Sequence, residues 1–158
     1  MVSRGFSALS AVKDEKDIQF IIRNPYSGTV EDMLNQRFYI NKENIMPFET
    51  NKYENINDYL SKYYDKIKKN SSKMRKNYKK YINKLNVIFE KNIAFFDFVS
   101  SGTTQMCLNK ILNTELVGFY FIRILDDYAD KQNLIIDSFQ KEGYSYELNT
   151  NLYNKDVE

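Results

Sequence analysis

Two runs of apolar residues, one at 93–96 and the other at 116–124, constrain the fold of this chain more than any other feature. Continuous apolar runs of this length are typical of strands that a parallel sheet buries on both faces. A turn-forming stretch and an amphipathic helical stretch separate the two runs. Residues 92–124 therefore predict one β-α-β unit with short connections and a right-handed crossover.

The sequence on either side of this unit predicts helices. Apolar residues recur at helical spacing over 56–85 with a polar break at 70–72, so this region is one long helix with a weak middle or two helices. Residues 29–38 begin with a threonine three positions before an aspartate, which is typical of a helix cap. A further helix is expected over 134–141, and 17–23 is either a short strand or the end of a helix.

These patterns predict an α/β protein, with a helical N-terminal half and a small Rossmann-like β-α-β parallel-sheet core. We expect a mainly helical region over 1–90, the Rossmann-like core over 91–144 and a polar C-terminal tail over 145–158. No apolar stretch approaches the ~20 residues that a membrane helix requires. No clear signal-peptide core is visible either, so a cytoplasmic location is the expectation.

The composition excludes several classes of chemistry. The 158 residues include no histidine and a single cysteine, Cys107. Ser-His and Cys-His catalytic pairs, His-ligated metals, internal disulfides and thiolate zinc clusters are thereby excluded. Cys107 falls inside the predicted helix of the β-α-β unit and is interpreted as a small core residue. No metal site is predicted, and Asp126, Asp127 and Asp130 are expected in a solvated loop after the second apolar run.

The net charge of +2 conceals an uneven distribution. Residues 62–84 hold ten basic side chains and one acid, Asp65, so that segment carries +9 and the rest of the chain carries −7. The ten are Lys62, Lys66, Lys68, Lys69, Lys73, Arg75, Lys76, Lys79, Lys80 and Lys84. This basic segment predicts either an anionic partner or a solvated lysine face. The tyrosines that accompany it favour packing over base-stacking.

The strand–turn–helix at 97–105 is the candidate ligand site. Ligands of open parallel sheets bind beyond the carboxyl ends of the strands, and a glycine-containing turn before a helix presents N–H groups to an anion. Asp97 is predicted at the end of the strand, where it would orient a ribose, a metal or the turn itself. The residues expected to contact a phosphate are Ser100, Ser101, Gly102, Thr103 and Thr104. The alternative is that these groups only hold the turn and cap the helix.

Residues 95–104 resemble the diphosphate-sugar loop of phosphoribosyltransferases, in which an apolar strand, two acids and two small residues precede a T/S-G-x-T turn. In this chain Phe98 replaces the second acid, which in that family contacts the ribose hydroxyls. The resemblance implies an enzyme that transfers a phosphoribosyl or glycosyl group with this loop. The departure at Phe98 counts against that activity.

A longer segment, roughly 55–124, resembles part of a bacterial group identified as predicted hydrolases of the haloacid-dehalogenase superfamily, found with glycosyltransferases in capsule and surface-polysaccharide loci. The shared pattern is an R-x-x-Y-x-x-Y helix from Arg75, a D-x-G-x-x-G-T-x-Q turn from Asp97 to Gln105 and a G-x-Y-F strand from Gly118. Val99 stands where that group usually has glycine. The superfamily's catalytic D-x-D-x-T/V signature is missing, so the resemblance is to an accessory part without the phosphatase, expected to be a fragment of a longer gene product.

This resemblance implies an accessory domain that binds a phosphate or a nucleotide sugar and is linked to surface-polysaccharide biosynthesis. The ligand would sit at the 97–105 turn, where Gln105 belongs to the shared motif, and Arg75 with nearby lysines would assist. No cofactor is indicated. Two alternatives stay open: a transferring enzyme that uses the same loop, and a non-enzymatic interaction module. In the latter, the 62–84 helix docks on acidic protein, nucleic acid or anionic lipid.

Overall fold

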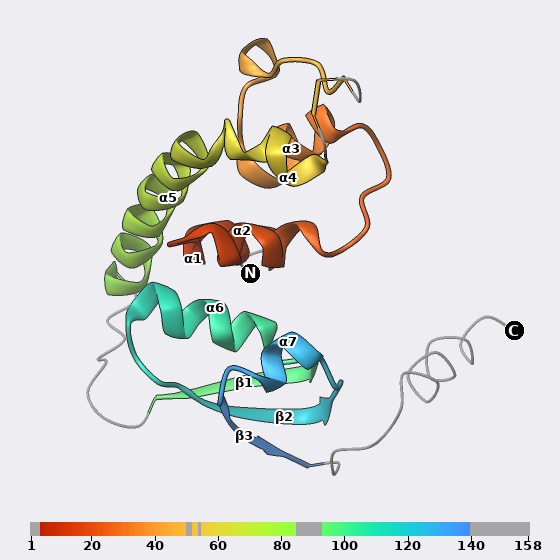
Figure 1. Ribbon diagram of the computed structural model, residues 1–158. Helices are drawn as coiled ribbons and strands as arrows, with labels where there is room; N and C mark the ends of the chain where they lie inside the picture. The colour runs from red at the N-terminus through yellow and green to blue at the C-terminus, as the bar shows by residue number, and fades with distance from the viewer. Residues whose placement is uncertain (1–3, 50–51, 54, 85–92, 140–158) are drawn as a thin grey trace, which may run out of the picture. The chain divides into compact units, whose positions relative to one another are not determined.

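The computed structural model describes residues 4–49, 52–53, 55–84 and 93–139 (Figure 1). The chain divides into two compact units, Met1–Asn86 and Val87–Glu158. The first is helical and the second holds a parallel sheet, so the predicted mixed α/β class is confirmed. The predicted tail over 145–158 lies outside the described residues. Among the described helices, none is long and apolar enough to cross a membrane.

Several helices of the first unit have clear start signals. Asp14 caps the helix that follows it and forms a reciprocal capping box with Asp17. Thr29 accepts a hydrogen bond from the backbone N–H of Asp32 at 3.1 Å, which confirms the predicted cap. The elements are α1 (Arg4–Ala11), α2 (Glu15–Ile22), α3 (Val30–Phe38), the 3-10 turn η1 (Lys42–Asn44), α4 (Ile56–Ser61) and α5 (Tyr64–Lys84).

Tyrosines take part in the core of the first unit as packing residues. Tyr59 is fully buried, and its ring contacts that of Tyr63 with centroids 5.3 Å apart. The Tyr59 hydroxyl donates to the carbonyl oxygen of Met46, whose backbone N–H donates to the Tyr63 hydroxyl at 2.8 Å. Burial raises the pKa of the Tyr59 hydroxyl, since the phenolate would lose its hydration. The predicted packing role of the tyrosine stripe is confirmed for these two residues.

The break between α4 and α5 does not fall where the sequence predicts it. Residues 70–72 lie inside α5, which is continuous from Tyr64 to Lys84. Their polar side chains bind other segments of the unit: Asn70 donates to the carbonyl oxygens of Phe38 and Tyr39, and Ser71 donates to that of Val12 at 2.7 Å. These residues therefore attach α5 to its neighbours and do not interrupt it.

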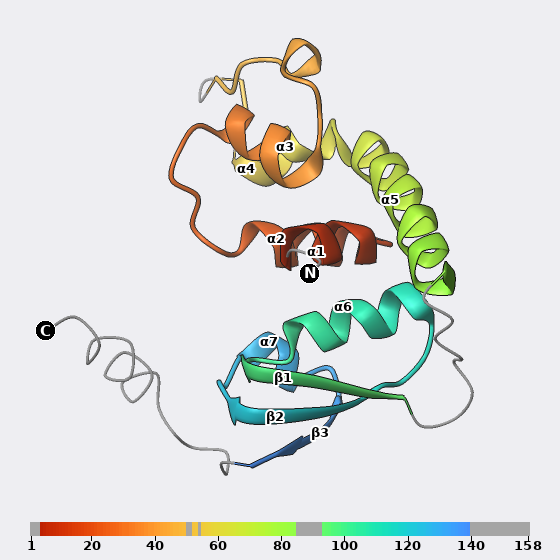
Figure 2. The ribbon, with the colours of Figure 1, turned by 180° about the vertical axis from the view of Figure 1, so that it is seen from behind.

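The second unit is a β-α-β unit extended by a third strand (Figure 2). Its elements are β1 (Ala94–Ser100), α6 (Thr103–Leu112), β2 (Val117–Arg123), α7 (Asp127–Asp130) and β3 (Ile135–Ser138). The strand order is β1-β2-β3 and both pairs are parallel. The predicted helix over 134–141 is wrong, because Ile135 and Ile136 are β-branched residues that pair with Val117 and Gly118 of β2.

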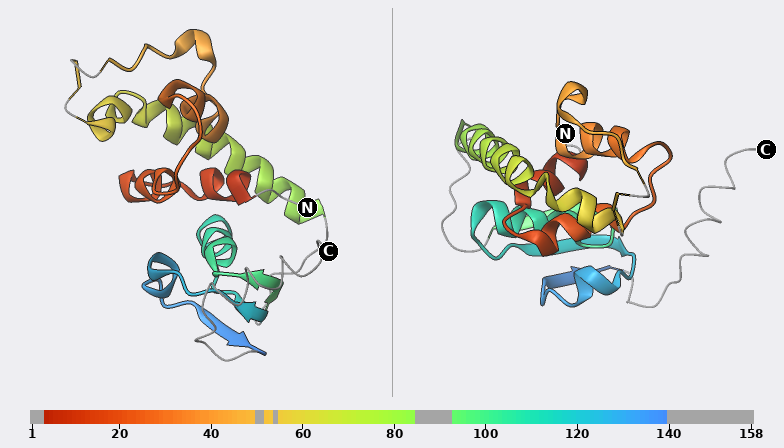
Figure 3. Two further views of the ribbon diagram at one scale, coloured as in Figure 1. Left: turned by 90° about the vertical axis from the view of Figure 1, so that its right-hand side faces the viewer. Right: turned by 45° about the horizontal axis from the view of Figure 1, so that its top comes forward.

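The sheet is buried on one face only. Helix α6 lies against one face of the sheet (Figure 3). Tyr120 and Ile122 of β2 are buried, and the Tyr120 hydroxyl donates to Gln105 of α6. On the opposite face no described helix of this unit covers the strands, and Phe96 is 70% exposed. The prediction that both apolar runs are buried on both faces is therefore wrong. Their continuous apolar pattern comes from an α6-facing set of side chains and a second, solvent-facing apolar set.

Candidate functional site

Asp97 lies within β1 and not at its end. The strand continues to Ser100, and Asp97 pairs in register with Tyr120 of β2. One carboxylate oxygen of Asp97 accepts a hydrogen bond from the backbone N–H of Phe98 at 2.9 Å. The predicted strand-end position is wrong, because the strand extends three residues beyond the aspartate. Asp97 also raises the pKa of the Tyr120 hydroxyl, although burial of that hydroxyl is the larger cause.

The turn between β1 and α6 is shaped by close packing. Gly102 has φ +87°, a left-handed conformation that glycine adopts without strain, and it is buried. A Cβ at this position would lie 3.1 Å from a methyl carbon of Leu134 and 3.3 Å from one of Ile136. Thr103 is buried as well. Two of the predicted phosphate contacts are thus buried, and Gly102 packs against Leu134 and Ile136.

Gln105 connects three segments of the second unit from within. It is fully buried, and its Nε2 donates to the carbonyl oxygens of Leu116 at 2.7 Å and Ile135 at 3.0 Å. Its Oε1 accepts from the hydroxyl of Tyr120 at 2.7 Å. A Cβ on Gly118 would lie 2.2 Å from that Oε1, so only glycine leaves room for the amide. We call Gln105, Gly118 and Tyr120 the glutamine network.

The glutamine network explains much of the motif that carries the family resemblance. The glutamine of the turn and the glycine and tyrosine of the G-x-Y-F strand meet at one buried point. Each polar atom of the amide is used within the protein. The sequence pattern predicted a ligand contact for Gln105 and did not predict its partners. The turn motif and the strand motif lie in the same β-α-β unit, and this proximity could have indicated that Gln105 contacts the strand.

Three hydroxyl-bearing residues of the turn are not fully buried. Ser100, Ser101 and Thr104 are half-buried, and they lie at the carboxyl end of β1 and the first turn of α6. The Ser100 hydroxyl accepts a hydrogen bond from the backbone N–H of Gly102 at 3.5 Å. The first intrahelical bond of α6 runs from Met106 N–H to the Gly102 carbonyl, so the preceding N–H groups belong to the helix N-terminus. This geometry suits a small anion.

The acidic segment after β2 is folded rather than a solvated loop. Asp126 caps α7, since its carboxylate accepts from the backbone N–H groups of Tyr128 and Ala129, both at 3.0 Å. Asp130 pairs with the guanidinium of Arg123. Among the described residues, no group of three or more acidic or cysteine side chains is arranged to hold a metal ion. Cys107 is buried in α6, as the sequence predicts.

Arg75 belongs to the first unit, whereas the 97–105 turn belongs to the second. Its Nε donates to the carbonyl oxygen of Ser10 at 2.9 Å, and one Nη donates to Ser71 Oγ at 3.0 Å and to the carbonyl oxygen of Val12. The two carbonyl acceptors, Ser10 and Val12, lie at and just beyond the C-terminus of α1, where a cation is favourable. Its guanidinium therefore holds α1 against α5.

Helix α5 presents its lysines in one row. Six of them recur every three or four residues, and we call this row the lysine face: Lys66, Lys69, Lys73, Lys76, Lys80 and Lys84. The opposite side of α5 faces the core with Ile67, Ser71 and Tyr78. Lys66 is half-buried and the other five are exposed. None of the six pairs with a carboxylate among the residues that the structure describes.

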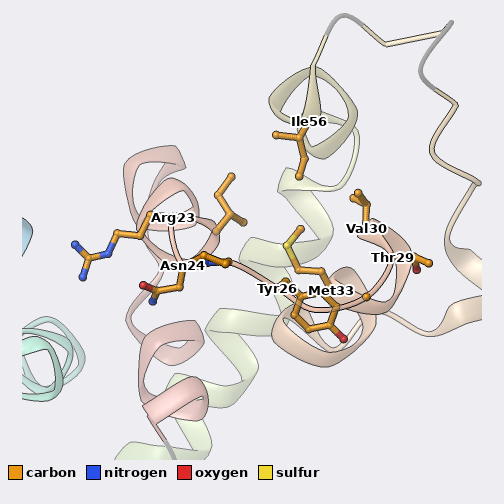
Figure 4. A pocket seen from close by; sticks show the side chains of 10 residues that line it. Arg23, Asn24, Tyr26, Thr29, Val30, Met33 and Ile56 are labelled. Atoms are coloured by element: carbon orange, nitrogen blue, oxygen red, sulfur yellow. The ribbon is translucent and has the colours of Figure 1, made fainter. Parts of the chain in front are cut away.

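A hollow of about 240 Å³ lies in the first unit between the α2–α3 connection and α4 (Figure 4). Tyr26, Val30, Met33 and Ile56 gather around it, whereas the Arg23 side chain points away. The hollow is mainly apolar, and it is smaller than the ~300 Å³ at which ligand pockets usually begin. It has no convergent polar groups that would orient a ligand.

Comparison of the chain with models of protein families, with curated proteins and with solved structures gave no match. The resemblances to phosphoribosyltransferases and to the haloacid-dehalogenase group thus stay predictions from the sequence.

Proposed function

We propose that the chain is a nucleic-acid-binding module that holds the phosphate backbone with the lysine face of α5. The observation that carries this proposal is the row of six lysines on the side of α5 opposite the core, without a neutralising carboxylate among the described residues. Such a row concentrates positive potential along one line. Phosphates bound there would release condensed counterions, which supplies the free energy of sequence-independent binding.

The form of the lysine face favours nucleic acid over a membrane. From Lys66 to Lys84 it extends about 27 Å along the helix, at a rise of ~1.5 Å per residue. A regular row of charges matches a polymer with regularly repeated phosphates. Membrane-surface helices also insert an apolar face, whereas the apolar side of α5 is occupied by the core through Ile67 and Tyr78.

The test is the affinity for labelled single-stranded and duplex DNA, measured by fluorescence anisotropy as salt is raised. If all six lysines contact phosphates, the slope of log K against log salt is about −5 on duplex DNA, since each contact contributes ~0.9. Lys69→Gln, Lys73→Gln and Lys76→Gln combined should reduce this slope by nearly 3 and weaken binding at every salt concentration.

A control variant with the same change in net charge distinguishes an effect of the lysine face from an effect of net charge on DNA binding. Lys13, Lys16 and Lys131 are exposed and lie outside α5, and the triple glutamine variant at these positions lowers the charge by the same amount. This control should keep most of the wild-type affinity and slope. Absence of DNA binding at low salt, or equal losses in both triple variants, would contradict the proposal.

We propose the β1–α6 turn as a second site, for a phosphate or the diphosphate of a nucleotide sugar. Its support is the set of half-buried hydroxyls on Ser100, Ser101 and Thr104 at the N-terminus of a ten-residue helix. The resemblance to surface-polysaccharide proteins favours a nucleotide sugar as the ligand, and an accessory role beside glycosyltransferases. We rank it second because Gly102, Thr103 and Gln105 are used in packing.

Calorimetric titration with nucleotide sugars and with inorganic phosphate tests this second site. Thr104→Val removes a partly accessible hydroxyl and keeps the side-chain shape, so it should weaken binding about tenfold, the effect of one hydrogen bond to a charged group. Thr114→Val is the matched control, because Thr114 is also half-buried but lies beyond the other end of α6. Equal affinity in wild type and Thr104→Val would remove the site assignment.

A further inference from the structure

The face of the sheet opposite α6 is an exposed apolar surface. Parallel register aligns its outward side chains into rows across the strands, such as Ala94 with Val117 and Ile135, and Phe96 with Phe119. We call this surface the phenylalanine face. Its large exposed side chains are Phe96 at 70%, Phe98 at 59%, Phe119 at 43%, Ile135 at 50% and Phe139 at 81%.

Three phenyl rings on this face stack across the sheet. The rings of Phe98 and Phe121 are 4.6 Å apart between centroids and nearly parallel, at 8°. Phe121 stacks in turn on Phe139 at 5.3 Å and 7°. Phe139 is held in place by a backbone hydrogen bond to the carbonyl oxygen of Tyr120 at 2.9 Å. The face is therefore an ordered surface of stacked rings.

The exposed apolar area is large for a surface that water covers. If each whole side chain contributes roughly 200 Å², the five named side chains expose on the order of 600 Å². A standard specific interface buries about 800 Å² on each partner, and crystal contacts bury mostly less than about 400 Å². Half-buried Val117 and Phe121 add to the exposed amount. The face thus approaches the area that a specific dimer needs.

We propose that the phenylalanine face is the interface of a homodimer, in which the sheets of two copies pack face to face. Strands of parallel sheets are usually covered on both faces, and a second sheet at ~10 Å is a standard cover. Asp137, which shares the row of Phe119, is on the edge strand β3. A two-fold arrangement can leave this carboxylate at the wet rim while the rings pack at the centre.

The charge of the second unit argues against nucleic acid as the occupant of this face. Residues 93–139 contain six carboxylates and three basic side chains. Aromatic platforms that stack bases lie in basic grooves, and this surface instead carries Asp137 in the row of Phe119. A second copy requires no cation on the face, because its contacts are phenyl rings and aliphatic groups.

Sedimentation of the full chain over the micromolar range tests the dimer. Wild type is expected to show a monomer–dimer equilibrium. Phe96→Lys should raise the dissociation constant at least ~100-fold, since one substitution places a charge in the interface from both copies. Tyr81→Lys is the control, because Tyr81 is 50% exposed on α5 in the first unit and should leave the equilibrium unchanged. Circular dichroism checks that both variants fold.

A tryptophan reporter shows whether association uses this face. The chain has no tryptophan, so Phe119→Trp introduces a single fluorophore on the face. Its emission should shift to shorter wavelength as the protein concentration rises through the dimer range. A monomeric wild type over this range, an equilibrium unaltered by Phe96→Lys, or association without an emission shift would each overturn the proposal.

Added salt distinguishes this interface from the lysine face. Dimerisation buries apolar area and brings together two units with excess carboxylates, so salt should leave it unchanged or strengthen it. DNA binding by the lysine face weakens with salt. The two proposals are therefore tested independently. The experiments can contradict dimerisation and support DNA binding, or contradict DNA binding and support dimerisation.

Discussion

The two units of this chain expose side chains of opposite character. The first unit buries its apolar residues between helices, and its longest described helix, α5, has a core side and a lysine side. The second unit places a polar network inside, around Gln105, and leaves phenyl rings outside. In the second unit, the polar residues of the motif are therefore poor indicators of a binding site. Its exposed phenylalanines are better indicators of one.

The largest effect is expected from breaking the glutamine network. Gln105→Met keeps the side-chain volume but removes its three hydrogen bonds, which leaves the Tyr120 hydroxyl and two carbonyl oxygens buried without these partners. We expect a loss of about 3 kcal/mol in the stability of the second unit. Hydrogen exchange should show reduced protection of β2 and β3 amides, with little change in the first unit.

The matched control for this change is Gln19→Met in α2. Gln19 donates to Asn57 Oδ1 at 3.0 Å on the surface and to the Tyr64 hydroxyl at 3.5 Å, so its loss should stay within about 1 kcal/mol. Equal effects of the two glutamine substitutions would show that burial of the polar network does not distinguish the second unit.

A smaller effect is expected from Arg75, a half-buried group of the first unit that, like Gln105, holds several segments together through hydrogen bonds. Arg75→Met removes its hydrogen bonds to the carbonyl oxygens of Ser10 and Val12 and should destabilise the first unit by about 2 kcal/mol. Urea unfolding measures the loss. Lys76→Met, at the next and exposed position, should change stability by less than about 0.5 kcal/mol. If Arg75→Met weakened nucleotide-sugar binding and left stability intact, the structural role assigned to it would be wrong.

The cap of α3 provides a third comparison within the first unit. Thr29→Ala removes the side-chain acceptor for the backbone N–H of Asp32 and should cost about 1 kcal/mol. Thr29→Ser retains that acceptor and should lie close to wild type. Thermal unfolding of the two variants checks this prediction, and an alanine variant as stable as the serine variant would refute it.

The smallest expected effect is on the stability of the first unit in acid. The pKa of Glu31 lies below its ordinary 4.5, chiefly because the backbone N–H of Phe48 donates to its carboxylate at 2.5 Å. Because the pKa of Glu31 is lower in the folded state, its hydrogen bond with Phe48 stabilises the fold fully above pH 4.5. This stabilisation is lost as the pH falls through the folded-state pKa. Glu31→Gln should therefore make the first unit less sensitive to acid between about pH 5 and pH 3.

Asp32 provides the check on that assignment. Its pKa is also lowered, mainly by the hydrogen bond from Lys42, but the pair is exposed and should respond to salt. Urea midpoints measured at several pH values, at low and high salt, separate the two carboxylates. A Glu31→Gln variant with wild-type acid sensitivity at high salt would contradict the role given to Glu31.

The sequence allowed the elements with strong local signals to be predicted. The β-α-β unit follows from two apolar runs on either side of a glycine turn, and the start of α3 follows from Thr29. The short strand β3 was missed because its four residues are too few to show a period of two. The exposed sheet face was missed because a continuous apolar run reads the same whether one face or both are covered.

The site was harder to predict than the fold, because its residues are defined by partners far along the chain. The role of Gln105 depends on Gly118 and on the carbonyl of Ile135, which reach it only when the strands pair. The role of Arg75 depends on carbonyl groups at Ser10 and Val12, more than sixty positions earlier. The lysine face was easier, since its spacing alone places the lysines on one side of a helix.

The fit between Gln105 and Gly118 has an evolutionary consequence. A side chain at 118 would occupy the position of the Gln105 amide, so a residue larger than glycine at 118 requires a shorter or displaced side chain at 105. Among relatives of this chain, the two positions should covary: a residue larger than glycine at 118 should be accompanied by one shorter than glutamine at 105. A protein that shares this pair of residues would therefore be expected to share the fold of the second unit. The pair would not by itself indicate a shared catalytic activity.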